Sequence, residues 1–567
     1  MKSFHKPHLA IISFLLASLI TFYLQSCGKD NIVDFSSIDN PDDYFENASF
    51  SRTISVVFSS SSASVTGASD DFDISISGAS VTIANNGSDS VLYNVSGSTS
   101  NGFLKIYSSV KQAICLNDAS ITNPSGAAIN IQGPSSSPSS GKRSYIVLSG
   151  SSSLADGSSY SNTPSNEDEK AALFSEGALL FSGSGSLSVT AIGNSAIASD
   201  SYVRILDAPT LSLSSSAGHG IRGKNKVVIS GGSLDISSSA NMKKGISSAG
   251  SVYISGGTTT ITVSGNAAYD SEESAYSGSA GIKAAAAFSI SGGSLSITNS
   301  GSGGKGISGD ATALFSGGSV SVKTTGSNYT SGDVSSKGIK FDGNITFSGS
   351  SVDVSCSAHE AIESKGSITI SDGVVYAYSA SDDAINSASD FTISGGLVCG
   401  HATSNDGLDA NGNFYISGGV VYAIGSSSPE VAVDANTEGG YKLYVTGGTI
   451  IAIGGLENGS SLSQSCYQAS SWSQSTWYSL SVGNTLYAFK TPSSAGSPLV
   501  VSGSSTPTLL SGVSVSGGSS YFNGTFYVSP TVSGGTSVSL SSYSGGNGGG
   551  NPGGGGNPGG GGGPGGH

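Results

Sequence analysis

Acidic residues recur on both sides of a small-aliphatic residue pair that repeats in the second half of the chain, and they are the residues best suited to chemistry. Like charges stacked on neighbouring strands lie about 4.8 Å apart and repel one another, so a counter-charge is expected. Ca²⁺ takes six to eight oxygen ligands and fits such a row, whereas the alternative is an acidic face that only water solvates. The expected calcium ligands are Glu360, Glu363, Asp382, Asp383, Asp406, Asp409 and Asp434.

In the earlier repeats the equivalent positions are basic, so the sign of the charge changes once along the row. A column of lysines would bind a polyanion such as a uronic-acid polymer, or it would form a solvated face with mobile side chains. The basic positions are His219, Arg222, Lys244, Lys283, Lys305, Lys337 and Lys340, of which we take Lys305, Lys337 and Lys340 as the candidate ligand-binding residues.

Outward-facing positions of one strand also change character along the chain. They are Ser and Thr in the early repeats and become apolar or aromatic from Val374 onward, with Tyr376 and Tyr422 as examples. An exposed apolar strip needs a cover or a ligand. One interpretation is that residues 456 to 543 fold back over the strip, and the other is that Tyr376 and Tyr422 form a platform on which sugar rings stack.

These positions belong to a repeat that predicts the fold. A small residue, an aliphatic residue and, 11 positions after the small residue, a glycine-rich turn recur from Ala172 to Ala432 at a spacing of about 23 to 25 residues. Insertions lengthen the repeat near 265 to 280 and 325 to 337. Apolar and polar residues alternate within each repeat, as strands require. We therefore expect an all-β chain folded as a right-handed parallel β-helix, because the Asn ladder and Leu-rich consensus of a leucine-rich repeat are missing.

The segments outside the repeat define the expected domain organisation. Lys2 and Lys6 precede an apolar run that ends in Leu24-Gln25-Ser26-Cys27, which resembles a lipobox and predicts lipidation of Cys27; an ordinary signal peptide or a single anchor helix is the alternative. The expected segments are a signal peptide (1–26), an anchor linker (27–49), an N-terminal cap with irregular first coils (50–170), the regular repeat (171–455), a small β-rich C-terminal unit (456–543) and a disordered Gly/Pro tail (544–567).

Composition excludes several classes of protein. Charged residues make up 11% of the 567 residues and the net charge is −15, which argues against nucleic acid as a partner. The five cysteines show neither a CxxC pair nor zinc-ligand spacing. The sequence contains no GxSxG, HExxH or P-loop motif.

From about residue 70 to 545 the Gly-Ile units, the Ile-Ser-Gly-Gly turns and the Gly/Pro tail together resemble the carbohydrate-binding-domain family of bacterial surface β-helix proteins, which is similar to pectate lyases in fold. The resemblance implies binding of acidic plant polysaccharides and of calcium through Asp-Asp-Gly-Ile units. Here Asp382–Ile385 (Asp-Asp-Ala-Ile) and Asn405–Leu408 (Asn-Asp-Gly-Leu) stay close to that unit, and His359–Ile362 approximates it. Most earlier units lack the acids.

We therefore expect an exported, lipid-anchored protein, exposed at the cell surface, that binds an acidic polysaccharide with the help of calcium. The sequence leaves catalysis open but favours a non-catalytic protein, because a pectate-lyase reaction needs a basic residue beside carboxylate-bound calcium. Arg222 lies six repeats from Asp382, whereas Lys340 and Lys365 are nearer. The alternatives are a structural adhesin or spacer without sugar binding, and a calcium-dependent polysaccharide lyase.

Overall fold

The computed structural model describes residues 38–133, 142–161, 163–164 and 167–545. Two units are distinguished, Met1–Pro41 and Asp42–His567, and the second contains every described strand. The predicted signal peptide, Cys27 and nearly all of the Gly/Pro tail lie outside the described residues. Among the described residues no helix has the length and apolar character needed to cross a membrane. The helical elements in the described part of the chain are short 3-10 turns, namely η2 (Pro41–Asp43), η3 (Phe45–Asn47) and η4 (Thr330–Gly332).

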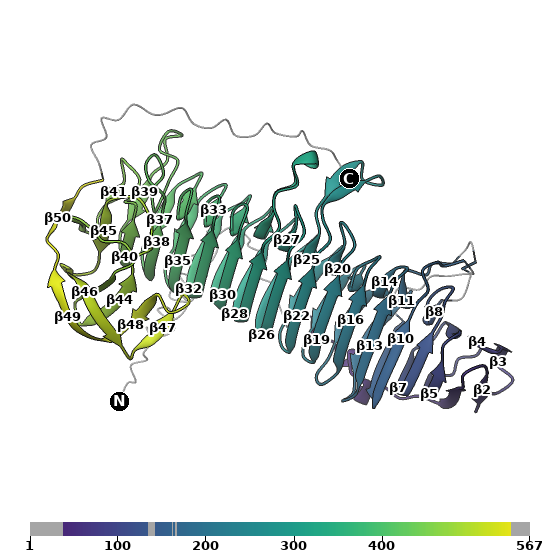
Figure 1. The fold of residues 1–567 in the computed structure, drawn as a ribbon. Helices are drawn as coiled ribbons and strands as arrows, with labels where there is room; N and C mark the ends of the chain where they lie inside the picture. The colour runs from purple at the N-terminus through teal and green to yellow at the C-terminus, as the bar shows by residue number, and fades with distance from the viewer. Residues whose placement is uncertain (1–37, 134–141, 162, 165–166, 546–567) are drawn as a thin grey trace, which may run out of the picture. The chain divides into compact units, whose positions relative to one another are not determined.

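The larger of the two main sheets has 28 strands, and consecutive repeats pair in parallel along it (Figure 1). Twelve of its strands form a closed ring of parallel neighbours. In ring order they are β7 (Gln112–Thr122), β9 (Arg143–Ser149), β12 (Ala178–Ser182), β15 (Tyr202–Ile205), β18 (Lys226–Ile229), β21 (Ser251–Ile254), β26 (Phe288–Asn299), β22 (Thr258–Val263), β19 (Ser233–Ser238), β16 (Thr210–Ser215), β13 (Ser186–Ala191) and β10 (Ser151–Ala155).

This ring corrects the predicted fold. A right-handed parallel β-helix would carry separate open sheets along its faces, whereas here two rows of strands meet in β7 and again in β26 and so close on themselves. The expectation of an all-β chain holds, but the expected β-helix is wrong. The physical reason lies in the Gly-Gly turns: in β26, Gly292 and Gly293 stay within one strand as an irregularity of register instead of ending it.

Further strands extend the ring in both directions. At the N-terminal side β1 pairs in parallel with β5 and antiparallel with β2. The additional strands are β1 (Arg52–Phe58), β2 (Ala63–Thr66), β5 (Val91–Thr99), β28 (Ala313–Thr324), β30 (Ile345–Cys356), β32 (Ile368–Ser379), β34 (Phe391–Ile393), β35 (Leu397–Ala402), β37 (Phe414–Ile416), β38 (Val420–Ile424), β39 (Leu443–Val445), β40 (Thr449–Ile453), β41 (Ser461–Leu462), β42 (Cys466–Ala469), β45 (Leu499–Ser502) and β50 (Leu540–Tyr543).

The second main sheet has 14 strands and carries the charged row. Each repeat contributes one short strand to it, and all its pairings are parallel except β3 with β4. Its strands in order are β3 (Phe72–Ser77), β4 (Ala79–Asn85), β6 (Gly102–Ser108), β8 (Ile129–Gln132), β11 (Ala171–Ser175), β14 (Ser195–Ser199), β17 (Ile221–Gly223), β20 (Lys244–Ser248), β25 (Ala280–Ala284), β27 (Lys305–Gly309), β29 (Lys337–Phe341), β31 (Ile362–Ser364), β33 (Ile385–Ser387) and β36 (Leu408–Ala410).

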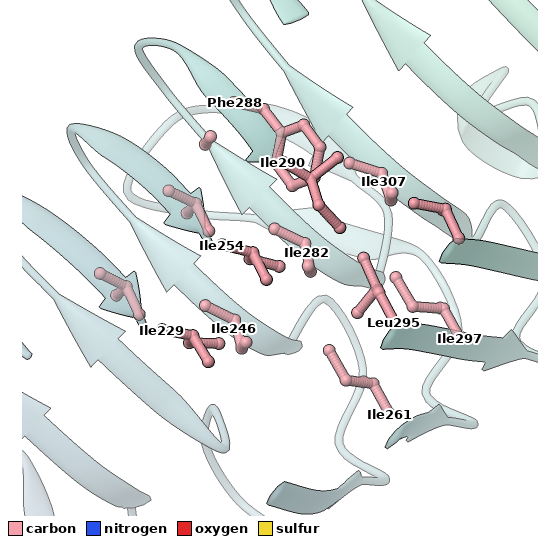
Figure 2. Close-up of a cluster of buried hydrophobic side chains, with 14 of the residues drawn as sticks. Ile229, Ile246, Ile254, Ile261, Ile282, Phe288, Ile290, Leu295, Ile297 and Ile307 are labelled. Atoms are coloured by element: carbon pink, nitrogen blue, oxygen red, sulfur yellow. The ribbon is translucent and has the colours of Figure 1, made fainter. Parts of the chain in front are cut away.

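The core is a continuous stack of aliphatic and aromatic side chains from both sheets. Figure 2 shows part of it, where Ile246, Ile282 and Ile307 of the smaller sheet follow one another beside Ile229 and Ile254 of the larger sheet. The small residue before each aliphatic one is required by close packing: a Cβ at Gly306 would lie 2.1 Å from Cγ1 of Val322. Each repeat therefore places its charged residues beside a fixed, buried anchor.

Residues beyond the repeats form an antiparallel sheet of six strands. Its order is β47 (Ser519–Tyr521), β48 (Phe526–Val528), β44 (Thr485–Lys490), β43 (Trp477–Val482), β46 (Thr508–Ser516) and β49 (Thr531–Ser537). A two-stranded hairpin, β23 (Ala268–Asp270) with β24 (Ala275–Ser277), is inserted between β22 and β25.

Candidate functional site

The register of the smaller sheet sets the charged residues in two rows, one that contains Lys305 and Lys337 and one that contains Lys340. Lys340 on β29 pairs with Glu363 on β31, Glu363 with Asn386 on β33, and Asn386 with Asp409 on β36. Lys283 on β25 occupies the same row two strands before Lys340, with Ser308 of β27 between them. The charge changes from positive to negative between β29 and β31, so the two halves of the row offer different chemistry.

Glu360 and Glu363, at the start of the acidic half, are neutralised by lysines of the protein. Nζ of Lys337 lies 3.0 Å from Oε2 of Glu360 and 2.5 Å from Oε2 of Glu363, and Lys365 also forms an ion pair with Glu363. Burial alone would raise the pKa of Glu363, but Lys337 and Lys365 outweigh it and lower that pKa. Lys337 is thus turned toward the acids and is not available as an open ligand-binding residue.

His359 neutralises the next acid in the row. Its Nδ1 lies 2.7 Å from Oδ2 of Asp382 and also contacts Glu360. Burial lowers the pKa of His359, but hydrogen bonds to Asp382 and Glu360 raise it to about 9, so the imidazole is positively charged at neutral pH. His359, Glu360 and Asp382 lie close enough to share a metal ion. Because a protonated imidazole cannot ligate, this group is better described as a salt-bridge network.

The remaining four acids have no such compensation. Carboxylate oxygens of Asp406, Asp409 and Asp434 lie within 4.8 Å of one another. Asn386 links Asp383 to them, since its Nδ2 donates to Oδ2 of Asp383 at 3.0 Å and to Oδ2 of Asp409 at 2.6 Å. In the described part of the chain no Lys, Arg or His forms an ion pair with any of the four. We call Asp383, Asp406, Asp409 and Asp434 the uncompensated cluster.

Burial and mutual repulsion perturb these carboxyl groups strongly. Burial, reinforced by the charges of Asp434 and Asp383, raises the pKa of Asp406 to about 10, and burial raises the pKa of Asp434 to about 7. The pKa values of Asp383 and Asp409 are also raised, mainly by burial and then by neighbouring carboxylates. Without a cation the cluster therefore retains protons near neutral pH.

The donor chemistry of the uncompensated cluster fits calcium. Every side-chain donor in it is a carboxylate oxygen, the ligand type that a hard cation prefers, and imidazole and thiolate are lacking among its described members. Backbone amides already orient two of the carboxylates: the amide of Asp406 donates to Oδ1 of Asp383 at 3.1 Å, and that of Val431 to Oδ1 of Asp406 at 2.5 Å. One carboxylate oxygen each of Asp406, Asp409 and Asp434 can therefore contribute to a shared ion.

The aromatic strip is covered. Tyr422 is 1% exposed; its hydroxyl donates to the carbonyl of Lys490 at 2.8 Å, and its ring lies 5.6 Å from those of Phe489 and Phe526. Tyr376 stacks on Phe522 at 5.6 Å. Residues of the six-stranded sheet thus cover the strip, as one of the two interpretations of the sequence expected. Burial removes Tyr422 as a platform for sugars, and Phe522 covers part of Tyr376, which is half-buried.

The other two candidate lysines lie in a cavity of about 210 Å³. Lys305 and Lys340 line it together with Lys244, Lys283 and Tyr276. Sequence reasoning placed the lysines in the basic column but missed Tyr276, which comes from the inserted hairpin β23–β24. The insertion near 265 to 280 was the sequence signal that could have pointed to Tyr276, because insertions in a regular repeat form loops, often on the binding face.

Comparisons with known proteins agree with this picture at the level of the family. A family model described as "carbohydrate-binding domain-containing protein" matches residues 77–274 and 283–383, more than half of the chain. The matched region contains the lysines and ends at Asp383. No curated protein matches. The solved structure of a polysaccharide lyase-like protein from C. thermocellum, a gadolinium derivative, aligns at 23% identity over 45% of this chain and 94% of that chain, with a TM-score of 0.36.

Proposed function

The chain belongs to the family of carbohydrate-binding domain-containing proteins, and from that premise we propose that it binds an acidic polysaccharide, with calcium held by the uncompensated cluster, and does not cleave it. The observation that supports the proposal is that some acids of the smaller sheet have a cationic partner and others do not. Glu360, Glu363 and Asp382 have cationic partners in the protein, whereas the four acids that follow have none.

Calcium would supply the missing charge and a link to the ligand. Asp406, Asp409 and Asp434 would hold the ion and Asp383 would contribute from the neighbouring strand. Calcium accepts more oxygens than these side chains offer, so a carboxylate of a uronic-acid polymer can complete its coordination. The net charge of the chain is −15, so a polyanion requires such a local positive charge to approach.

Binding without cleavage is supported by the state of the nearby bases. A lyase needs a basic group free to remove a proton next to the uronate carboxylate. The nearest candidates, Lys337, Lys365 and His359, are all held in ion pairs with Glu360, Glu363 or Asp382. The carboxylates raise the pKa of Lys337 and of His359, which makes these two groups poor bases.

Calorimetric titration of the chain with polygalacturonate, in calcium and in EDTA, tests the proposal, with ultraviolet absorbance of the same samples reporting unsaturated product. We expect calcium-dependent binding, no product, and at least a tenfold loss of affinity, about 1.4 kcal/mol, in the Asp406→Asn/Asp409→Asn variant. Asp235→Asn, an exposed site on β19, is the control for loss of a carboxylate outside the cluster. Formation of product would establish a lyase, and binding of no polysaccharide would leave a structural rod.

We also propose that the protein is exported and anchored to the cell envelope by a lipid on Cys27, on the basis of the apolar run and the lipobox-like sequence before it. Fractionation of cells that express the chain or Cys27→Ser tests this. The wild-type chain is expected in the membrane fraction and the variant outside it; an equal distribution of the two would refute lipidation at this residue.

A further inference from the structure

The lysine-lined cavity is distinct from the uncompensated cluster and has the opposite charge. Lys244 on β20, Lys283 on β25, Lys305 on β27 and Lys340 on β29 all line it. The described residues around it include no acid, and Ser277, Ser279 and Ser308 add hydroxyl groups. Four strands of one sheet therefore direct cationic and hydrogen-bonding groups into one small space.

Two insertions in the repeat form the outer wall of this cavity. The first is the hairpin β23–β24, in which Tyr269 and Tyr276 are paired and their rings meet edge to face at 5.3 Å. The second carries Tyr329, whose ring lies 6.0 Å from that of Tyr276. Gly332 packs so closely against Tyr276 that a Cβ there would lie 2.2 Å from its ring. The hairpin and the second insertion are thus fitted to one another around Tyr276.

The two tyrosines of the hairpin are exposed. Tyr269 is 53% exposed and Tyr276 is 42% exposed. Tyr276 also lines the cavity, so its ring is accessible from the space that the lysines face. Carbohydrate and small-molecule sites typically combine such aromatic surface with a few converging polar groups.

The lysine charges are only partly balanced. Lys283 and Lys340 form ion pairs with Asp310 and Asp342, which do not line the cavity. Nζ of Lys244 donates to the carbonyl of Met242 at 2.6 Å, a neutral partner. In the described structure Lys244 and Lys305 form no ion pair. Neither lysine thus has a carboxylate in direct contact, and the more distant Glu273 and Asp270 near Lys244 and Glu363 near Lys305 do not outweigh the effect of burial.

The neighbouring Lys337 provides an internal comparison. It pairs in register with Lys305, but Glu360 and Glu363 overcome the effect of its burial and raise its pKa. For Lys305, burial followed by the charges of neighbouring lysines lowers the pKa to about 8, and Lys244 is lowered to about 8 by burial and by Lys243 and Lys283. An anion in the cavity would therefore relieve a repulsion that Glu360 and Glu363 already offset at Lys337.

We propose that this cavity binds one anionic sugar residue of the polysaccharide, with its carboxylate or sulfate group on Lys244 and Lys305 and its ring against Tyr276. The proposal rests on the proposed function and adds a second, calcium-independent subsite to it. A volume of about 210 Å³ is below the roughly 300–1,000 Å³ of drug-sized pockets, so it suits a single sugar rather than a chain.

The two subsites are close enough for one polymer to reach both. Lys305 on β27 is four strands from Asp409 on β36, which corresponds to about 19 Å along the sheet, and Lys244 on β20 lies two strands further away. A polyanion could therefore place one sugar on the lysines and a later carboxylate on the calcium of the uncompensated cluster. Such joint binding raises the affinity of a polymer above that of either subsite alone.

Titration of the chain with trigalacturonate in EDTA, monitored by calorimetry, tests this subsite without calcium. Wild-type protein is expected to bind trigalacturonate but not its uncharged methyl ester, and Lys305→Gln and Lys244→Gln are each expected to lose at least tenfold in affinity. Lys323→Gln, an exposed lysine on β28, serves as the matched control and should bind as the wild type does. A sulfated galactan trisaccharide in a parallel titration shows whether carboxylate or sulfate is preferred; stronger binding of either supports an anionic sugar.

Two results would overturn the inference. One is equal binding of trigalacturonate by the wild type and both lysine variants, and the other is binding of neither charged trisaccharide in EDTA. Retained calcium-dependent binding of polygalacturonate in Lys305→Gln shows that this variant is folded. If polygalacturonate binds with calcium while the trisaccharides do not bind in EDTA, only this inference fails; if polygalacturonate does not bind under either condition, the proposed function fails.

Discussion

Replacing Asp406 by Asn should stabilise the calcium-free protein at neutral pH. Asp406 is 9% exposed and burial with its acidic neighbours raises its pKa to about 10, whereas an aspartate in the unfolded chain has a pKa of about 3.9. A carboxyl group whose pKa is higher in the folded state contributes nothing below pH 4, where it is protonated in both states. Above that pH it opposes folding, because the unfolded chain gains free energy by releasing the proton.

The size of the effect follows from the difference between these pKa values. Between pH 3.9 and pH 7 the folded protein keeps its proton on Asp406, so the cost grows by about 1.4 kcal/mol per pH unit and reaches about 4 kcal/mol at pH 7. Asparagine does not titrate, and its amide oxygen can still accept the hydrogen bond from the amide of Val431. Asp406→Asn should therefore gain up to about 4 kcal/mol at pH 7 and almost nothing at pH 4.

Urea denaturation in EDTA at pH 4, 7 and 8.5 measures this, with Asp235→Asn as the control for loss of one negative charge. In calcium the difference should shrink, because the ion stabilises only the protein that binds it, by about 2.7 kcal/mol at one hundred times the Kd and about 4.1 kcal/mol at one thousand times the Kd. A variant that is less stable than the wild type in EDTA at pH 7, or equally more stable at pH 4 and pH 7, would refute the reasoning.

Three further predictions follow from the same contacts. Lys337→Met should destabilise the protein by about 3 kcal/mol in urea titrations, because it leaves Glu360 and Glu363 buried without Lys337 as a cationic partner. Adding Glu363→Gln should recover part of this loss, and full stability of the single variant would count against the salt-bridge network. Tyr422→Ala should lower the free energy of unfolding by about 3 to 5 kcal/mol and leave polygalacturonate binding unchanged, because the Tyr422 ring is part of the buried core. A stable variant with weakened binding would instead support the interpretation of Tyr422 as a sugar-stacking residue. Calcium affinity should rise with pH above 7 and calcium binding should release protons, because the carboxyl groups of the cluster must lose their protons to bind the ion. Calorimetry in buffers of different ionisation enthalpy detects the released protons, and a pH-independent affinity would contradict the raised pKa values.

The repeat was predictable because its physical cause is local. A small residue followed by an aliphatic one can be recognised wherever it recurs, and each copy, such as Gly306-Ile307, anchors one strand of the smaller sheet. The closure of the larger sheet was not predictable. It depends on whether a Gly-Gly pair ends a strand, as Gly231 and Gly232 do after β18, or remains inside one, as Gly292 and Gly293 do in β26.

The acidic row was visible in the sequence, but its division into two parts was not. The spacing of the repeats places Glu363 and Asp409 in one row. Spacing alone does not reveal that the side chain of Lys337 reaches the next repeat and contacts Glu360 and Glu363. The role of Tyr276 was hidden for a related reason. Its position depends on how one insertion packs on another, and those contacts are distant in the sequence.

The most direct test of the central claim is the anomalous scattering of calcium in crystals of the chain grown with calcium and trigalacturonate. Our account predicts a calcium peak at about 2.3–2.6 Å from carboxylate oxygens of Asp406, Asp409 and Asp434, with a uronate oxygen among the remaining ligands. A uronate bound elsewhere with no ion at these carboxylates, or calcium bound at His359, Glu360 and Asp382 instead, would contradict it.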